Sequence, residues 1–138
     1  MPSGEAFTDP QISEIGRAAR VAGGETGLHF SVFVGSAEGE VRRYAERLHA
    51  ALGDQASNGV LVFVSPGQRR MEIVVGREAR HRLDDRACAL AAMSMCSAFT
   101  VGDLTGGLVT GLRMLAEGAG SSEALPLPLP LEAGRFAG

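Results

Sequence analysis

The feature that most constrains the fold is an almost uninterrupted apolar run at residues 59–64, Gly-Val-Leu-Val-Phe-Val. A strand that is exposed on one face alternates apolar and polar side chains, whereas this run has no polar position. Continuous apolar strands are typical of sheets that are covered on both faces. The run therefore predicts a central strand with further elements packed above and below it.

The neighbouring segments predict the partners of this strand. A turn at residues 65–68, Ser-Pro-Gly-Gln, separates it from a second strand at residues 70–75, so these two strands should form an antiparallel hairpin. Residues 28–34 predict another strand, because their even positions are apolar and alternate with the odd ones. An amphipathic helix at residues 39–52 connects that strand to the central one, which predicts a strand–helix–strand crossover.

Helices are predicted on both sides of these strands. The first covers residues 10–22, with Asp9 as its cap and Pro10 in its first turn. A short helix is predicted at residues 78–83. Residues 87–99 contain only Ala, Cys, Leu, Met, Ser and Phe, and a helix that is apolar on every side is predicted to be buried. The last helix begins at Gly102-Asp103 and ends near residue 117.

The predicted order α-β-α-β-β-α-α defines the fold class as α/β, with a small mixed β-sheet sandwiched by helices. The predicted domain spans residues 9–117. We expect residues 1–8 to be a flexible N-terminus and residues 118–138 a flexible proline-containing tail, because Leu and Pro alternate over residues 125–130 and cannot continue a helix.

Composition excludes several functions. All 13 basic residues are arginine, so chemistry that depends on a lysine of this chain, such as a Walker lysine or a Schiff base, is excluded. The net charge of −3 and the lack of aromatic residues among the arginines argue against nucleic-acid binding. No apolar run reaches the ~18 residues of a membrane span, and no secretion signal is apparent, so a cytoplasmic location is expected.

The five aspartates of the chain all fall in predicted loops or at predicted helix starts. Aspartate is a common helix cap, which is one interpretation of this placement. The other is that loop carboxylates converge at one rim of the sheet, where they could bind a hard cation or act in acid–base catalysis. The sequence leaves both open for Asp9, Asp54, Asp84, Asp85 and Asp103.

Six arginines fall between residues 69 and 86. They could bind a phosphate or an acidic partner through paired hydrogen bonds, or they could form a solvated face. None of the three histidines has metal-ligand spacing with another His or Cys, and there is no Gly-x-Ser-x-Gly nucleophile motif. The glycines of the last helix are better explained by close helix packing than by phosphate binding. They are Gly102, Gly106, Gly107 and Gly111.

An ordered series of short stretches carries a family resemblance. It begins with residues 52–54 (Leu-Gly-Asp), 58–65 (Asn-Gly-Val-Leu-Val-Phe-Val-Ser) and 70–76 (Arg-Met-Glu-Ile-Val-Val-Gly). It continues with residues 83–85 (Leu-Asp-Asp) and with residues 99–103 (Phe-Thr-Val-Gly-Asp) before a Gly-Leu-containing helix. This series resembles the TPM domain, a family of thylakoid-lumen proteins, photosystem II repair factors and many bacterial proteins.

The resemblance implies a helix-covered mixed sheet with a shallow acidic site that binds a divalent cation, Ca²⁺ or Mg²⁺, and a phosphatase-like activity. Carried over to the matching positions, it implies Asp54, Asp84 and Asp103 as metal ligands and Asn58 as a ligand-binding residue. Relatives often have an N-terminal Asp-x-x-Gly-x-Leu stretch, which only Asp9 approximates here. They also often have a secretion signal and a membrane helix, so this chain resembles a stand-alone, soluble, actinobacterial-type member.

The residues support two functional hypotheses. The first is a metal-binding, phosphatase-like protein, in which Arg70 or Arg77 would hold the phosphate; the sequence assigns no catalytic nucleophile or base. The second is a non-catalytic binding or assembly module, whose arginine-rich face contacts an acidic protein partner of unknown identity.

Overall fold

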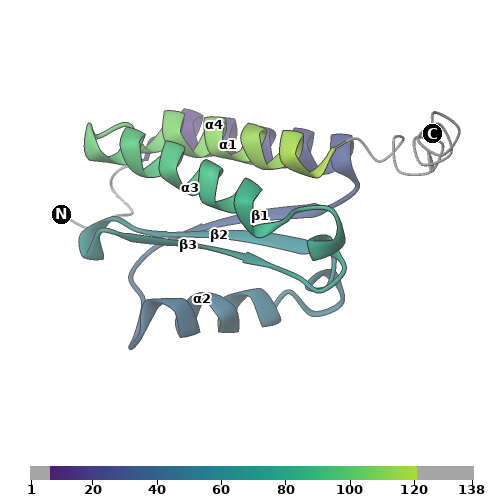
Figure 1. The fold of residues 1–138 in the computed structure, drawn as a ribbon. Coiled ribbons are helices and arrows are strands. Elements are labelled where there is room, and N and C mark those ends of the chain that lie inside the picture. The colour runs from purple at the N-terminus through teal and green to yellow at the C-terminus, as the bar shows by residue number, and fades with distance from the viewer. Residues whose placement is uncertain (1–6, 121–138) are drawn as a thin grey trace, which may run out of the picture.

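The computed structural model describes residues 7–120, and Figure 1 shows that these form a layered α/β domain. The predicted tail at 118–138 therefore lies outside the described residues, apart from its first three positions, as does most of the predicted flexible N-terminus. The predicted element order and α/β fold class are confirmed. The elements are α1 (Asp9–Thr26), β1 (His29–Val34), α2 (Val41–Ala50), β2 (Gly59–Ser65), β3 (Arg70–Val75), α3 (Asp85–Thr100) and α4 (Leu104–Ala119), with short 3₁₀ helices η2 (Gly53–Gln55), η3 (Pro66–Gln68) and η4 (Ala79–His81).

The sheet has three strands in the order β1-β2-β3. β2 pairs in parallel with β1 and antiparallel with β3, so that Val62 lies opposite both Val32 and Ile73. All seven residues of β2 are buried. Figure 1 shows the reason: α2 covers one face of the sheet, and α1, α3 and α4 cover the other. The central, doubly covered strand that the apolar run predicts is confirmed.

Two apolar clusters fill the spaces between the sheet and the helices on its two faces. Under α2, Leu61 and Phe63 of β2 pack against Val41 and Ala45, and the Tyr44 ring meets the Phe63 ring edge-on at 5.6 Å between centroids. On the opposite face, the alternate β2 side chains face the three helices. That larger cluster includes Val60, Val62, Val64, Leu108, Leu112 and Leu115.

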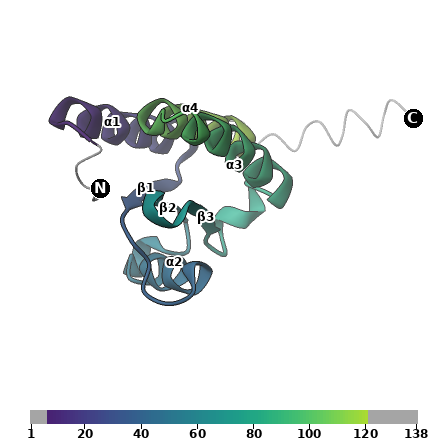
Figure 2. The same cartoon turned by 90° about the vertical axis from the view of Figure 1, so that its left-hand side faces the viewer.

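The helical layer is centred on α4, which packs against α1 on one side and α3 on the other (Figure 2). The close approach of α4 to α3 requires glycine: a Cβ at Gly107 would lie 2.8 Å from the Phe99 ring and 2.9 Å from the Ala98 Cβ. The packing role predicted for the α4 glycines is confirmed at this position. α4 continues past the predicted end at residue 117 to Ala119, and Gly118 in this last turn lies close to Ala87 of α3.

The cap of α1 differs from the prediction. Thr8, rather than Asp9, is the N-cap: its hydroxyl accepts a hydrogen bond from the Gln11 N–H at 3.3 Å, and the Gln11 side chain accepts one from the Thr8 N–H at 2.9 Å. Asp9 occupies the first helical position, where its negative charge still interacts favourably with the positive end of the helix dipole. The reciprocal Thr-x-x-Gln pair is a capping box, which competes successfully with a lone aspartate.

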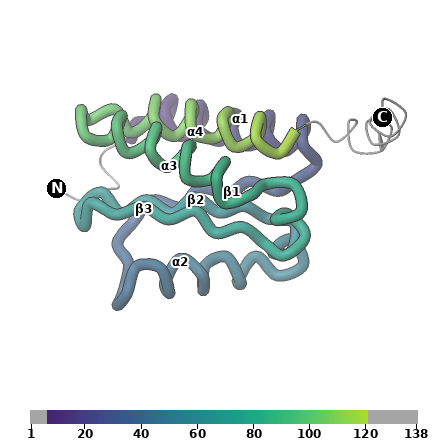
Figure 3. Tube along the Cα trace, in the orientation of Figure 1, coloured from purple at the N-terminus to yellow at the C-terminus, as the bar shows by residue number. Residues whose placement is uncertain are grey.

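Arg82 joins two helix ends that the chain trace brings together (Figure 3). Its guanidinium donates to the Thr26 carbonyl at the end of α1, and to the Gly120 carbonyl at the end of α4 at 2.6 Å. Both carbonyls lie at the negative end of a helix dipole. The Arg82 cation therefore supplies hydrogen-bond donors to carbonyls that have no partner within their helix, and its charge is attracted to the negative helix end. Arg82 therefore has a structural role, and it is unavailable to an external ligand.

Candidate functional site

Two of the three aspartates predicted as metal ligands are helix caps. The Asp84 carboxylate accepts a hydrogen bond from the Ala87 N–H at the start of α3, at 2.9 Å. The Asp103 carboxylate accepts one from the Gly106 N–H at the start of α4, also at 2.9 Å. Asp54 lies exposed in η2. The capping interpretation is thus confirmed for Asp103, whereas at α3 the cap is Asp84 and not the expected Asp85, which lies in the first turn of the helix.

The structure does not bring Asp54, Asp84 and Asp103 together. Within residues 7–120, no three or more His, Cys, Asp or Glu side chains are grouped so that they could hold a metal ion. Ca²⁺ takes six to eight oxygen ligands, and Mg²⁺ is commonly held by one or two carboxylates together with waters and phosphates. The proposed metal site stays a prediction that depends on the family resemblance.

The predicted ligand-binding residues lie apart from one another. Asn58 is used internally: its side-chain amide donates to the Gly27 carbonyl at 2.9 Å, which fastens the loop before β2 to the end of α1. Arg70 lies at the start of β3, where its Nη2 is 3.5 Å from the Glu72 carboxylate. Arg77 is exposed just after the other end of β3. The geometry gathers no phosphate cradle from these three residues.

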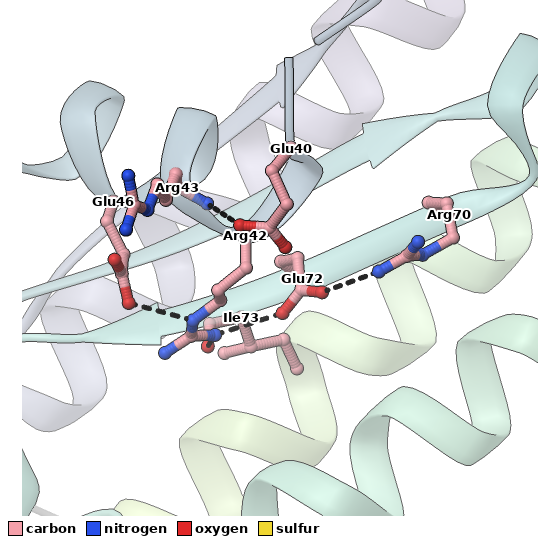
Figure 4. Close-up of polar contacts among 7 residues, drawn as sticks. All are labelled: Glu40, Arg42, Arg43, Glu46, Arg70, Glu72 and Ile73. Atoms are coloured by element: carbon pink, nitrogen blue, oxygen red, sulfur yellow. Dashed lines mark hydrogen bonds and ion pairs between the residues drawn. The ribbon is translucent and has the colours of Figure 1, made fainter.

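A polar network that no sequence pattern predicts lies along β3 (Figure 4). Arg42 of α2 donates to the Glu72 carboxylate at 3.0 Å, to Glu46 at 3.1 Å and to the Ile73 backbone carbonyl at 3.0 Å. Burial acts to lower the pKa of the Arg42 guanidinium, but the bonds to Glu72 and Glu46 outweigh it, so this pKa is raised. The network fastens α2 to the sheet.

The outward side of α3 is largely apolar, and no residue within 7–120 covers it, which contradicts the prediction of a helix buried on every side. Leu90 is 48% exposed, Met93 67% and, just past the helix end, Val101 79%. Only the opposite side of α3 packs inward, through Ala91 and Met95. The reason is that α4 occupies the centre of the helical layer, which leaves α3 at its margin (Figure 2). We call the outward residues the α3 stripe: Ala89, Leu90, Met93, Cys96, Ser97 and Val101.

A hollow adjoins the C-terminal end of the α3 stripe. Its volume is about 380 Å³, and it lies between the end of α3 and the β2–β3 turn. Met71, Phe99 and Leu104 contribute apolar lining, and Arg69 and Arg70 are the charged residues that line it. Cys96 belongs to both surfaces, so the hollow continues the α3 stripe. The combined surface is apolar with cations at one end.

The arginine-rich segment does not form one face. Arg69 and Arg70 line the hollow, whereas Arg77 and Arg80 lie near the N-terminal end of α3, and Arg82 is committed to the helix ends. A second hollow, of about 450 Å³ between α1 and α4, has a rim of both signs, with Glu14 and Arg17 among its lining residues. The cationic end of the α3 stripe is therefore the better candidate for binding an acidic group.

The two cysteines provide a test of this surface. Cys96 is exposed on the α3 stripe, whereas Cys88 is half-buried. Burial, and next the carboxylates of Asp85 and Asp84, raise the pKa of the Cys88 thiol. A raised pKa leaves less thiolate at pH 8, and the thiolate is the reactive form. When the α3 stripe is uncovered, we expect maleimide to modify Cys96 at least about tenfold faster than Cys88, measured by mass spectrometry with the Cys88→Ser and Cys96→Ser variants.

The pH dependence gives the control for this prediction. Modification of Cys88 should keep accelerating as the pH rises above the ordinary thiol pKa, because its own pKa lies higher. Equal rates for the two cysteines at pH 8 would show that the stripe is covered or that Cys88 is open to solvent.

The fold and this surface define a class: a small α/β domain with a mixed three-stranded sheet and a partly uncovered helical layer. The chain belongs to the family described as Domain of unknown function (DUF5130), which it matches over residues 1–116. Within residues 7–120, no helix has the length and apolar character needed to cross a membrane.

Two mycobacterial proteins are similar to this chain in sequence. Uncharacterized protein MT2543 of Mycobacterium tuberculosis strain CDC 1551 / Oshkosh is 33% identical over 93 residues, which are 66% of this chain and 54% of that protein. Uncharacterized protein Rv2468c of strain ATCC 25618 / H37Rv gives the same values. This chain thus spans about half the length of these relatives.

The fold itself recurs in solved structures. The NMR structure of BA42 from Bizionia argentinensis is similar with a TM-score of 0.73 at 20% identity, over 82% of this chain and 81% of that one. The N-terminal domain of cg2496 from Corynebacterium glutamicum is similar with a TM-score of 0.68 at 17% identity, over 84% and 76%. At these identities the likeness concerns the fold alone.

Proposed function

We propose that this domain is a non-catalytic binding module, and that it binds an acidic, apolar segment of a protein partner. The α3 stripe would contact the apolar side chains, and Arg69 and Arg70 would bind a carboxylate at its end. The observation that carries the proposal is the exposure of Leu90, Met93 and Val101 along one side of a helix that has no charged residue from Ala87 to Thr100. Solvent-facing sides of helices in globular domains are ordinarily polar.

Two physical arguments support this surface over the others. Burial of exposed apolar area stabilises a complex by a free energy of roughly 25 cal/mol per Å². Contiguous exposed apolar patches therefore mark interaction sites. Arginine binds carboxylates through paired hydrogen bonds, and within the described residues Arg69 makes no ion pair that a partner would have to break. An acidic end and an apolar body are therefore the complementary features of a partner.

The phosphatase-like hypothesis has weaker geometric support. Asp84 and Asp103 already accept backbone N–H groups at helix starts. A carboxylate keeps spare lone pairs in that position, but the three predicted ligands would have to converge from separate elements. A binding module requires no such rearrangement.

A fluorescent peptide of alternating leucine and glutamate is a suitable probe. We expect it to bind the full chain in a salt-dependent way, and we expect Met93→Glu and Arg69→Glu each to weaken binding by roughly tenfold, or about 1.4 kcal/mol. The matched controls lie on α1, where Ile12 is also exposed and Arg17 is also a surface cation. Ile12→Glu and Arg17→Glu should leave the affinity unchanged, as measured by fluorescence anisotropy.

Two results would contradict the proposal. One is equal affinity for all four variants, which would show that the peptide binds elsewhere or through net charge alone. The other is a clear rise in melting temperature with Ca²⁺ or Mg²⁺ that Asp54→Asn abolishes, since a ligand that binds the folded state raises its stability. The second result would favour the metal-dependent hypothesis.

A further inference from the structure

We infer that the α3 stripe is covered by the chain's own Leu-Pro segment, residues 125–131, which would compete with an external partner. This inference rests on the proposed function, because it assigns an occupant to the same surface. Four leucines and three prolines alternate in the segment, and Glu132 follows it. The segment therefore has the apolar body and acidic end that the surface is proposed to recognise.

The described part of the chain ends beside the start of α3. Gly118, in the last turn of α4, is so close to α3 that a Cβ there would lie 2.9 Å from the Ala87 Cβ. The Gly120 carbonyl accepts a hydrogen bond from Arg82 at 2.6 Å, and Arg82 lies three residues before α3 begins at Asp85. The chain that follows Gly120 therefore starts beside the N-terminal end of α3, which is the end at which the α3 stripe begins with Ala89 and Leu90.

The Leu-Pro segment can be compared in length with the α3 stripe. From Leu90 to Val101 the stripe measures about 17 Å at a rise of ~1.5 Å per helical residue. A residue that precedes proline is pushed towards extended conformations, and seven extended residues span about 22 Å at ~3.1 Å each. The four residues 121–124 can bridge up to roughly 13 Å, which is enough to reach Leu90 from the end of α4. The segment is thus long enough to follow the whole stripe.

The direction of the Leu-Pro segment along the α3 stripe determines where its acidic end lies. A segment that starts at the N-terminal end of α3 and follows the stripe arrives at the hollow with Glu132. Arg69 and Arg70 are the charged residues that line this hollow, and no acidic residue lines it. Leucines would lie along Leu90 and Met93, and the carboxylate would reach the cations, so both the apolar pattern and the charge agree with the same orientation.

A disulfide formed with the native Cys96 tests this placement in the full chain. Cys96 lies about 9 Å along α3 from Leu90, which corresponds to roughly three extended residues; if Leu125 contacts Leu90, Pro128 lies opposite Cys96 and Leu127 is one residue away from it. In a Cys88→Ser background, Leu127→Cys supplies the second thiol, and diamide serves as the oxidant that accepts the two hydrogens. A bond requires the two Cα atoms within about 7 Å of each other.

The control keeps the tail and moves the target. Cys96→Ser together with Thr110→Cys places the thiol on the exposed side of α4 instead. We expect the Cys96 pair to oxidise at least about tenfold faster than this control, because a docked segment has a high effective concentration at its site. In the Cys96 pair, adding Met93→Glu should slow the reaction several-fold, with the fold checked by circular dichroism. Equal rates for the pair and the control would overturn the inference.

The Leu-Glu peptide separates this inference from the proposed function. If the segment covers the stripe, the full-length double variant Leu127→Ser/Leu129→Ser should bind the peptide several-fold more tightly than the unaltered chain, because competition is removed. Tight peptide binding with equal oxidation rates would leave the proposed function standing and overturn the inference. Fast oxidation at Cys96 with no peptide binding by either chain would support the docked segment and contradict recognition of an external partner.

Discussion

The substitution Gly76→Ala is expected to destabilise the domain by about 3 kcal/mol, at the upper end of overpacking effects. Gly76 follows β3, and its N–H donates to the Gly59 carbonyl at 2.8 Å. A Cβ at this position would overlap the backbone carbonyl oxygens of Ala56 and Ser57. The Ser57 oxygen cannot move freely, because it accepts hydrogen bonds from Glu78 at 2.9 Å and Ala79 at 3.1 Å.

Urea denaturation of Gly76→Ala measures this loss directly, and the melting temperature should fall by roughly 10–20 °C for a domain of this size. The matched control is Gly24→Ala. Gly24 lies in α1, and apart from its chain neighbours and the backbone of its own helix, no atom lies within 4 Å of a Cβ placed there. Alanine is the better helix former, so this variant should gain about 0.5–1 kcal/mol. Shifts of the same sign in the two variants would show that the Gly76 contact is not what limits the substitution.

The second large effect is expected for Arg82→Ala, with a loss of about 3 kcal/mol. The variant removes donors from the Thr26 and Gly120 carbonyls, and the cation from two helix C-termini. Hydrogen bonds to a charged group contribute about 1.5–3 kcal/mol each, and a cation at a helix end adds up to ~2 kcal/mol. Arg82→Lys should recover less than half of the loss, because a lysine keeps the charge but not the planar fork that spans both ends.

Arg80→Ala is the control for Arg82, since Arg80 is exposed in η4 of the same segment. Its effect on the free energy of unfolding should stay within about 0.5 kcal/mol. If Arg80→Ala and Arg82→Ala had the same effect, the loss would reflect the net charge of the segment. In that case the carbonyl contacts of Arg82 would have no special importance for stability.

The sequence predicts the sheet well because its signal is local. The apolar run at residues 59–64 specifies a strand covered on both faces, and β2 is that strand. The turn at residues 65–68 specifies the hairpin, and β2 and β3 do pair antiparallel. Helix positions follow from periodicity in the same way, although Thr8 rather than Asp9 provides the cap of α1.

The arrangement of the helical layer is harder to predict because it depends on competition between helices. α3 and α4 are both apolar, and their composition alone does not say which of them occupies the centre. Gly107 and Gly111 contain the missing information: small residues on one side of α4 let α3 approach closely, so α4 can take the central position. The uncharged side of α3 is consequently exposed, although its composition predicts burial.

The candidate site could be predicted only in part for a related reason. Arginines near residue 70 are visible in the sequence, but their proximity to the exposed end of α3 depends on tertiary packing. The Arg42–Glu72 pair joins residues 30 positions apart, and no local pattern marks such a pair. Aspartates at helix starts are ambiguous in principle, since a cap and a metal ligand call for the same residue at the same place.

The bond from Arg42 to the Ile73 carbonyl has a consequence for self-association. β3 is an edge strand. The backbone groups of successive strand residues point alternately to the two sides of the strand. The Gly76 N–H points to β2, and Ile73 is an odd number of residues away, so the backbone groups of Ile73 point away from the sheet. An unpaired edge is a template on which another chain can add a strand, and proteins commonly blunt such edges with charge. Arg42 already occupies the central acceptor of this edge at 3.0 Å, with Glu72 beside it. An incoming strand would have to displace the Arg42 guanidinium and leave Glu72 without its partner. Arg42 therefore disfavours the addition of further strands to this edge, which is the step by which amyloid-like sheets grow.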